Sequence, residues 1–424
     1  MQKKILIITY YFPPSGGSGV QRWLKFVKYL PEFNIQPIVL TVDEKYASYP
    51  QYDNSLMTDV SKDLRIEKTK TCEILSLYKR LSPTKEVPYG GFSNEKKPNL
   101  FQKLSRFLRG NFFLPDPRRG WNKYAYKKAC EIIEQEHIET IITTSPPHST
   151  QLIGLRLKKR FPMIKWIADL RDPWTEIYYN KDLYQTKLAR HINRHYEIQV
   201  LKTADKIITV SESCKSMFEK KVDIKEKINV ISNGYDEDDF ANVKTNKDNS
   251  NFVISYIGVL SPQYEIDTFI AAVKQLSKTI KQKLLIRFVG QVYQGSKDKL
   301  DNLGVKIEYV DYVPHKTAVS YMLSSDILLL IIPNISDNKG ILTGKLFEYI
   351  AAKRQIALVG PVDGDAANII NKSGIGDVFA YGESSSLSNF IERVYNNEIC
   401  CLNYNSKCYS RKFLTQQLSE IIAD

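Results

Sequence analysis

The amino-acid sequence predicts an α/β protein with two doubly wound domains, and three observations support this prediction. The chain has 424 residues, which is too long for one ordinary hydrophobic core and suits two domains. Near the N-terminus, an apolar strand pattern at residues 4–11 leads into a glycine-rich loop and then a helical pattern at residues 20–30. That order of elements opens a doubly wound domain. A second series of apolar strands begins at Phe252, so we expect the pattern to occur twice.

The composition is that of a soluble globular protein, with 43% hydrophobic and 25% charged residues. The formal net charge of +13 suggests an anionic partner: a nucleotide, a nucleic acid or an acidic membrane surface. The six cysteines show no CxxC spacing and the five histidines are scattered. We therefore expect free thiols in a reducing compartment, with no zinc site and no other metal centre.

The first residues, MQKKILIITYYF, do not form a signal peptide pattern. Their apolar run is short, is interrupted by Thr9 and tyrosines, and has no small-residue cleavage site. No stretch of the sequence is long and apolar enough to span a bilayer. We expect a cytoplasmic protein whose contact with a membrane is peripheral.

The first domain is expected at residues 1–235. After its first strand, Gly16, Gly17, Ser18 and Gly19 form a loop whose backbone can approach a ligand closely. The loop is not the GxGxxG dinucleotide motif, and the alternative is a tight turn that binds nothing. Further strands are expected at residues 36–42, 139–144, 165–169, 205–210 and 228–231.

Polar residues follow two strands of this domain, where ligands bind in open α/β sheets. His148 follows the strand at 139–144, and Asp169, Arg171 and Asp172 stand at the end of the next strand, in the segment DLRDPW. We interpret these four residues as candidates for orienting a substrate. The alternatives are that Asp172 caps a helix and that His148 is a loop residue bonded to the backbone.

Residues 75–128 interrupt the alternation of strands and helices and are rich in basic and aromatic residues. Within them lies a helical pattern whose apolar face comprises Leu100, Phe101, Leu104, Phe107 and Leu108. Its basic residues are Lys103, Arg106 and Arg109. A basic amphipathic helix with aromatic residues is typical of a membrane surface. The alternative is a surface helix whose apolar face packs on the domain.

The second domain is expected at residues 252–403, after a polar linker at 236–251. Its strands are predicted at 252–257, 284–289, 305–309, 327–332 and 355–359. The final segment, 404–424, is expected to form a helix that crosses back to the first domain.

The segment from Lys339 to Gly360 is the strongest candidate for a ligand site. A glycine-containing loop precedes a helix there, and a helix N-terminus presents free N–H groups and a positive dipole to an anion. Lys345 adds a positive charge, and Glu348 is a carboxylate on a largely apolar helix, where it needs a partner. A nucleoside diphosphate sugar would supply a partner for each feature, with its phosphates at the loop and Lys345 and its ribose hydroxyls on Glu348. The alternative is an ordinary helix start with an exposed Lys and Glu. The full candidate donor site comprises Gly258, Gly290, Val313, Gly340, Ile341, Leu342, Thr343, Gly344, Lys345 and Glu348.

The sequences TGKLFEYIAA and GPVDGDAANII resemble the donor-binding segment of glycosyltransferase family 4, whose members have the GT-B fold. That family usually has two glutamates separated by seven residues. Glu348 matches the second, which the resemblance makes a ribose ligand. Gly340 stands in place of the first, so recognition of the sugar by that glutamate does not carry over. The family's usual histidine at the DLRDPW strand is also absent, and His148 is the nearest histidine by topology.

The resemblance implies two Rossmann-like domains that face each other across a cleft containing the active site. It further implies a nucleotide-sugar donor such as a UDP-sugar, transfer of a hexose with retention of configuration, and no metal or other cofactor. The basic amphipathic helix adds an expected acceptor: a polyprenyl diphosphate-linked saccharide at the cytoplasmic face of the inner membrane, in the synthesis of capsule, O-antigen or exopolysaccharide.

Three other functions remain open at this point. A UDP-GlcNAc 2-epimerase shares the fold and needs no acceptor. A non-catalytic partner of a transferase would keep the fold without the chemistry, and Gly340 favours this alternative. A nucleic-acid-binding protein would explain the charge, but no nucleic-acid-binding motif is present in the sequence.

Overall fold

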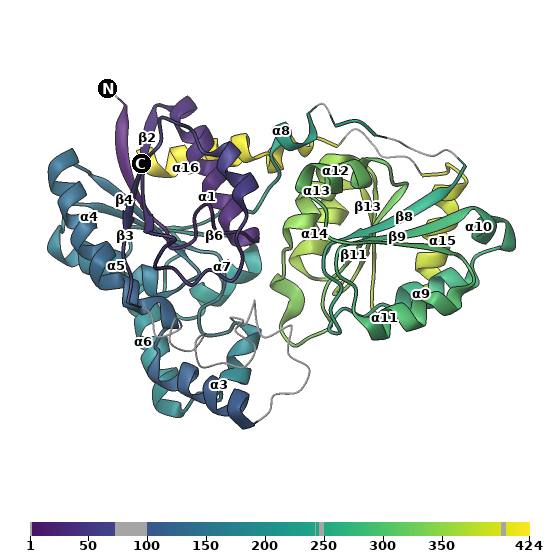
Figure 1. Cartoon of the computed structure of the whole chain (residues 1–424), viewed down its shortest axis with the longest axis horizontal. Helices are drawn as coiled ribbons and strands as arrows, with labels where there is room; N and C mark the ends of the chain where they lie inside the picture. The colour runs from purple at the N-terminus through teal and green to yellow at the C-terminus, as the bar shows by residue number, and fades with distance from the viewer. Residues whose placement is uncertain (1, 73–99, 242, 246–249, 400–403) are drawn as a thin grey trace. The chain divides into compact units, whose positions relative to one another are not determined.

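The structure is a computed structural model that describes residues 2–72, 100–241, 243–245, 250–399 and 404–424. The chain forms two compact units (Figure 1). The first contains Met1–Ser232 together with Arg411–Asp424, and the second contains Asn233–Ser410. The C-terminal helix α16 (Arg411–Ala423) therefore belongs to the first unit, although the second unit separates it in sequence.

The described part of the first unit contains a seven-stranded parallel sheet with the order β3-β2-β1-β4-β5-β6-β7. The direction of the order reverses between β1 and β4, and ligands bind at such a point in open α/β sheets. The strands are β1 (Lys3–Ile8), β2 (Ile35–Val42), β3 (Arg65–Thr69), β4 (Thr140–Ser145), β5 (Lys165–Leu170), β6 (Lys206–Thr209) and β7 (Ile228–Val230).

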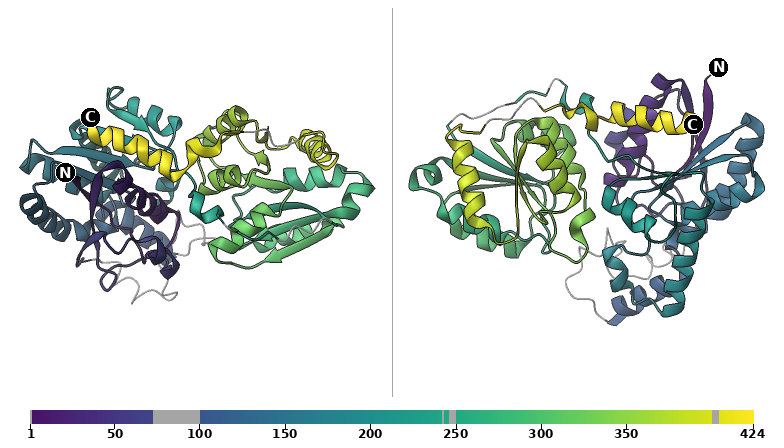
Figure 2. Two further views of the ribbon diagram at one scale, coloured as in Figure 1. Left: turned by 90° about the horizontal axis from the view of Figure 1, so that it is seen from above. Right: turned by 180° about the vertical axis from the view of Figure 1, so that it is seen from behind.

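Helices cover both faces of this sheet (Figure 2). Residues of α4 (Asn122–Glu136), α5 (Ser149–Arg160) and α6 (Lys187–Thr203) share one core cluster with alternate strand residues such as Leu6 and Ile8. On the opposite face, α1 (Ser18–Tyr29) and α16 pack with the intervening residues, including Ile5 and Ile7. Burial of both faces explains why the strands read as continuous apolar runs. The short helix α7 (Glu212–Glu219) also belongs to this unit.

The helix α3 (Leu100–Phe112) lies where the sequence predicts a basic amphipathic helix. Gly110 packs so closely on the 3-10 helix Tyr178–Leu183 that a Cβ there would lie 2.3 Å from the carbonyl oxygen of Leu183. Arg106 is only 7% exposed, which corrects its expected place on a solvent-facing basic side. The apolar residues face outwards instead, with Leu104 57% and Phe112 70% exposed. The part of the expected insertion at residues 75–99 lies outside the described residues, and the side chain of Phe101 is likewise not described.

In its described residues, the second unit has a six-stranded parallel sheet with the order β10-β9-β8-β11-β12-β13. The strands are β8 (Phe252–Ile257), β9 (Leu284–Val289), β10 (Lys306–Val310), β11 (Ile327–Ile331), β12 (Gln355–Val359) and β13 (Gly376–Phe379). The two sheets with their helices confirm the predicted doubly wound α/β fold.

The helices of the second unit also form two layers. On one face of the sheet pack α9 (Asp267–Gln275), α10 (Lys278–Lys283), α11 (Gln294–Leu300) and α15 (Ser384–Tyr395). On the other pack α12 (His315–Leu323), α13 (Gly344–Ala352) and α14 (Asp365–Ser373). The short α8 (Glu237–Phe240) packs on α12 and α13.

Candidate functional site

The first group of candidate residues lies at the carboxyl ends of β1, β4 and β5, at the point where the strand order of the first unit reverses. Arg171 connects the loops that follow these strands. Its Nε donates to the carbonyl oxygen of Ser145 at 2.8 Å, and its two terminal nitrogens donate to Gly19 at 2.5 Å and to Pro146 at 3.3 Å. Because all three acceptors are backbone carbonyls, Arg171 holds the first turn of α1 against the end of β4 and the loop that follows it.

Asp169 is buried in the core of the first unit. Its Oδ2 accepts hydrogen bonds from Trp23 Nε1 at 2.7 Å and from Thr144 Oγ1 at 2.8 Å, and its Oδ1 lies 3.3 Å from a terminal nitrogen of the buried Arg22. The sequence places this carboxylate on the acceptor side of a site. The structure instead gives it three protein partners, two of which, Trp23 and Arg22, join α1 to the sheet, so we correct its expected role to a structural one.

Asp172 lies only three residues after Asp169, but its surroundings are different. It is half-buried, and the described residues supply no hydrogen-bond or ion-pair partner for its carboxylate. Burial raises the pKa of Asp172 above its ordinary value, and the neighbouring Arg171 partly opposes this. No helix begins directly after it in the described chain, so the helix-cap interpretation does not apply. Of the two aspartates, Asp172 is the one available to a ligand.

His148 is buried with its ring stacked on Trp174, at a centroid distance of 4.9 Å and an interplanar angle of 10°. Neither ring nitrogen has a hydrogen-bond partner among the described residues, and nor does Trp174 Nε1. Burial, with the positive charges of Arg171 and Lys221, lowers the pKa of His148 to about 3. The imidazole is therefore neutral at physiological pH and offers one donor and one acceptor.

The second group of candidates surrounds the N-terminus of α13, in the second unit. Lys345 Nζ donates to Tyr256 Oη at 2.8 Å and lies 4.2 Å from the centroid of that ring and 5.7 Å from that of Tyr264. These are cation–π distances. Burial lowers the pKa of Lys345 to about 7, while Glu348 acts in the opposite direction. An anion that approaches this lysine would stabilise its charged form.

Two strand-end glycines pack closely beside Lys345, Gly258 directly and Gly290 against the backbone of Gly258. Gly258 follows β8 with a φ of 117°, and a Cβ there would lie 2.9 Å from Lys345 Cε. Gly290 follows β9 with a φ of 116°, and a Cβ there would lie 2.8 Å from the carbonyl oxygen of Gly258. A positive φ and close packing both require glycine at these positions. Gly258 thus leaves space for the lysine side chain, and Gly290 leaves space for the backbone of Gly258.

The start of α13 has the features of an anion site. Its N-cap, Thr343, makes no capping hydrogen bond, and the buried hydroxyl of Thr343 has no partner among the described residues. The N–H groups of the first helical turn therefore lack a side-chain cap. Gly340 ends the preceding 3-10 helix (Asn338–Gly340), and Ile341, Leu342 and Val313 pack against the core beneath α13.

Glu348 has a partner that was not among the expected site residues. Its Oε1 lies 2.9 Å from His315 Nε2, and His315 Nδ1 lies 3.9 Å from an Asp239 carboxylate oxygen. A carboxylate on an apolar helix predicts that some partner exists. The sequence gives no sign of which one, because 33 residues separate His315 from Glu348.

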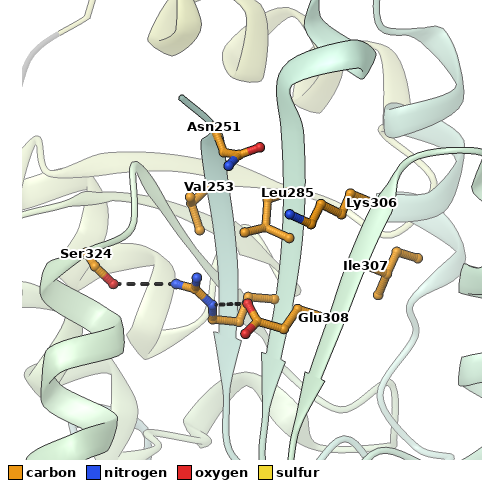
Figure 3. Close-up of a pocket in the computed structure, with 8 residues that line it drawn as sticks. Asn251, Val253, Leu285, Lys306, Ile307, Glu308 and Ser324 are labelled. Carbon is orange, nitrogen blue, oxygen red and sulfur yellow. Dashed lines mark hydrogen bonds and ion pairs between the residues drawn. The ribbon is translucent and has the colours of Figure 1, made fainter. Parts of the chain in front are cut away.

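Other features of the described residues do not point to a further site. A hollow of about 360 Å³ in the second unit contains the Arg287–Glu308 ion pair, 2.6 Å between Nε and Oε2 (Figure 3). It lies beside the first residues of β8, β9 and β10, at the opposite edge from the glycine-bearing strand ends. Among the described residues, no cluster of His, Cys, Asp and Glu is arranged to hold a metal ion, and no helix is long and apolar enough to cross a bilayer.

Comparisons with known proteins agree with the fold. The profile described as Glycosyltransferase Family 4 matches residues 90–239, and that described as Glycosyl transferases group 1 matches residues 237–409. A search of curated protein sequences gave no match.

Three solved structures illustrate the likeness. Anabaena HepE in complex with UDP is 13% identical, with a TM-score of 0.61 and 99% of each chain covered. WaaG, a glycosyltransferase involved in lipopolysaccharide biosynthesis, is 13% identical, with a TM-score of 0.55 and the same coverage. A putative UDP-N-acetylglucosamine 2-epimerase from Listeria monocytogenes is 10% identical, with a TM-score of 0.56, covering 100% of this chain and 96% of its own. At these identities the likeness shows the fold alone. The two family matches, which together span residues 90–409, and this fold show that the chain belongs to the family 4-like glycosyltransferases of the GT-B fold.

Proposed function

We propose that this protein transfers a hexose from a UDP-sugar to a lipid-linked saccharide, with retention of anomeric configuration and without a metal ion or other cofactor. The observation that supports it most directly is the position of two side chains on α13: Lys345 lies at the uncapped start of the helix, and Glu348 lies one turn further along it. The UDP bound to the related fold of Anabaena HepE supports a uridine nucleotide.

In this proposal the donor diphosphate binds at the first turn of α13, where Lys345 and the N–H groups stabilise the charge that grows on the leaving group. The ribose hydroxyls donate to Glu348. On the acceptor side, Asp172 and neutral His148 orient the attacking hydroxyl. The leaving phosphate takes the proton of that hydroxyl, so no protein base is required.

Replacing Glu348 with Ala should weaken UDP binding by about tenfold or more, because the ribose hydroxyls lose their acceptor. Titration calorimetry with UDP measures the affinity, and circular dichroism confirms that the variant is folded. Glu398→Ala is a matched control, since this surface glutamate lies beyond α15 in the same unit. An unchanged affinity in folded Glu348→Ala protein would exclude the ribose assignment.

The acceptor proposal depends on the outward face of α3. We define the α3 patch as the exposed residues Leu104, Phe107, Leu108, Phe112, Tyr184 and Leu188. The patch residues come from α3 and from the segment 184–188. Asn111 joins the two, because its side chain donates to the carbonyl of Tyr184 and accepts from the N–H of Thr186. Lys103, Lys187 and Arg190 are also exposed, and they lie on the same two helices as most residues of the patch, α3 and α6. Apolar residues with basic neighbours suit an anionic lipid surface, and we propose that this face binds the cytoplasmic side of the inner membrane. A polyprenyl diphosphate acceptor would reside in that membrane, in the synthesis of a surface polysaccharide.

The double variant Leu104→Ser and Phe107→Ser should reduce sedimentation with phosphatidylglycerol vesicles by about tenfold or more, since each apolar side chain loses its burial in lipid. Met163→Ser is the control, because Met163 is exposed in the same unit but lies outside the patch. The attraction should also weaken as salt is added. If wild-type protein does not sediment at low salt, or if the double variant unfolds, the patch is not a membrane surface.

A sugar-nucleotide epimerase would also bind UDP-GlcNAc at this site, and the likeness in fold to such an enzyme makes it the second candidate. Incubation with the donor alone distinguishes the two: an epimerase changes the donor without any acceptor, whereas a transferase requires one.

A further inference from the structure

Three helices of the second unit meet at His315. It is the first residue of α12, and its imidazole lies between Glu348 on α13 and Asp239 on α8. These helices pack on one another. The Nε2–Oε1 distance of 2.9 Å is that of a hydrogen bond, while the 3.9 Å separation between Nδ1 and the Asp239 carboxylate is too long for one. The Nε2 side of the His315 ring is thus hydrogen-bonded to Glu348, and the Nδ1 side faces Asp239.

This contact limits how Glu348 can present its oxygens. A glutamate side chain has three rotatable torsions, and a half-exposed one on a helix surface adopts several rotamers. A ring nitrogen that holds Oε1 fixes the orientation of the carboxylate plane. A carboxylate accepts about four hydrogen bonds, so Glu348 can keep His315 on Oε1 and still accept from two further hydroxyl groups.

We propose that His315 is a positioning residue that orients Glu348 toward the two ribose hydroxyls of the donor, and that it thereby sets the preference for a ribonucleotide. This inference rests on the proposed function, in which Glu348 binds the ribose. Its ligand is the vicinal 2′,3′-diol of a nucleoside diphosphate. Without His315 the glutamate side chain is free to adopt other rotamers, so its hydrogen bonds would contribute less to the binding of the diol.

The experiment compares UDP with 2′,3′-dideoxy-UDP by titration calorimetry, in wild-type protein and in the variants His315→Ala, His315→Gln and Glu348→Ala. His315→Ala should weaken UDP binding by about threefold to tenfold, as expected for one lost hydrogen bond. Its affinity for the dideoxy nucleotide should not change. His315→Gln should recover much of the loss, because its amide N–H can reach the same oxygen.

Different results would contradict the ribose role of Glu348 and the positioning role of His315. If wild-type protein does not prefer UDP over the dideoxy nucleotide, or if Glu348→Ala keeps the preference, the ribose role of Glu348 is wrong. If that preference depends on Glu348 but His315→Ala keeps it in full, only the role of His315 is overturned. Equal losses for both nucleotides in His315→Ala would also overturn it, since they would indicate a general structural effect. In a double variant that combines His315→Ala with Glu348→Ala, the loss of His315 should not weaken UDP binding further than the loss of Glu348 alone.

Discussion

Replacing Asp169 with Asn should destabilise the first unit by about 3–5 kcal/mol, because breaking a buried ion pair leaves an uncompensated charge in the core. Arg22 is buried and has Asp169 as its counter-ion, and its other terminal nitrogen donates to the Ser232 carbonyl at 2.9 Å. Burial lowers the pKa of Arg22, and Asp169 opposes that effect. The guanidinium stays charged nonetheless. The asparagine would also weaken the bond from Trp23 Nε1.

Tryptophan fluorescence during urea denaturation measures this loss. All four tryptophans, at positions 23, 121, 166 and 174, belong to the first unit, so their signal reports its unfolding. Asp172→Asn is the matched control, because Asp172 has no partner among the described residues to lose. It should keep the wild-type midpoint while lowering sugar transfer. An unchanged midpoint in Asp169→Asn would contradict the structural role, and full transfer in Asp172→Asn would exclude an acceptor role.

Replacing Lys345 with Met should weaken UDP-sugar binding by roughly 10- to 150-fold at pH 6, since hydrogen bonds to a charged group contribute about 1.5–3 kcal/mol. The methionine keeps roughly the length of the lysine stem, but it loses the contacts that the Lys345 ammonium makes with the rings of Tyr256 and Tyr264. The loss therefore isolates the ammonium group. Lys316→Met, on the neighbouring α12, is the control and should bind as the wild type does.

The affinity of the wild type should also depend on pH, in a direction that the pKa of Lys345 fixes. That pKa is about 7 in the free protein, and a bound diphosphate raises it because it favours the charged form. Below pH 7 the lysine is already charged and affinity is maximal. Above pH 7 binding must take up a proton, so affinity falls, by up to tenfold per pH unit, until the pH passes the pKa of the complex. A UDP-sugar is the proper probe, because its diphosphate does not titrate in this range. A flat profile from pH 7 to 9, or the same slope in Lys345→Met, would contradict this prediction.

The sequence predicts the layers of the fold well because buried parallel strands have a strong apolar pattern. It does not separate Asp169 from Asp172, and the reason is local. Strand β5 continues to Leu170, so Asp169 is still within the sheet and its side chain lies beneath α1. Asp172 lies beyond the strand end, where the backbone no longer alternates. The predicted strand ends one residue too early, at Asp169, and that is enough to count a core carboxylate among the available ones.

The amphipathic pattern of α3 likewise predicts the helix but not which side packs. Apolar faces normally turn inward, yet here Arg106 and Gly110 face the domain and Leu104 faces solvent. The close approach of Gly110 to Leu183 sets that orientation, and it is a tertiary contact that periodicity does not contain. The contact between His315 and Glu348 is also a tertiary one, between residues distant in sequence, so the sequence pattern does not predict it either.

The placement of α16 has a consequence for how the chain is made. Leu414, Leu418 and Ile422 complete the core on the α1 side of the first sheet, and the main-chain carbonyl of Ile422 accepts from Lys3. A ribosome therefore releases the whole second unit, which is one continuous segment, before it releases the helix that the first unit still lacks. Domains usually finish folding in the order of synthesis. In this chain the later unit is complete first, and the earlier one must keep an apolar surface open until its last helix is translated.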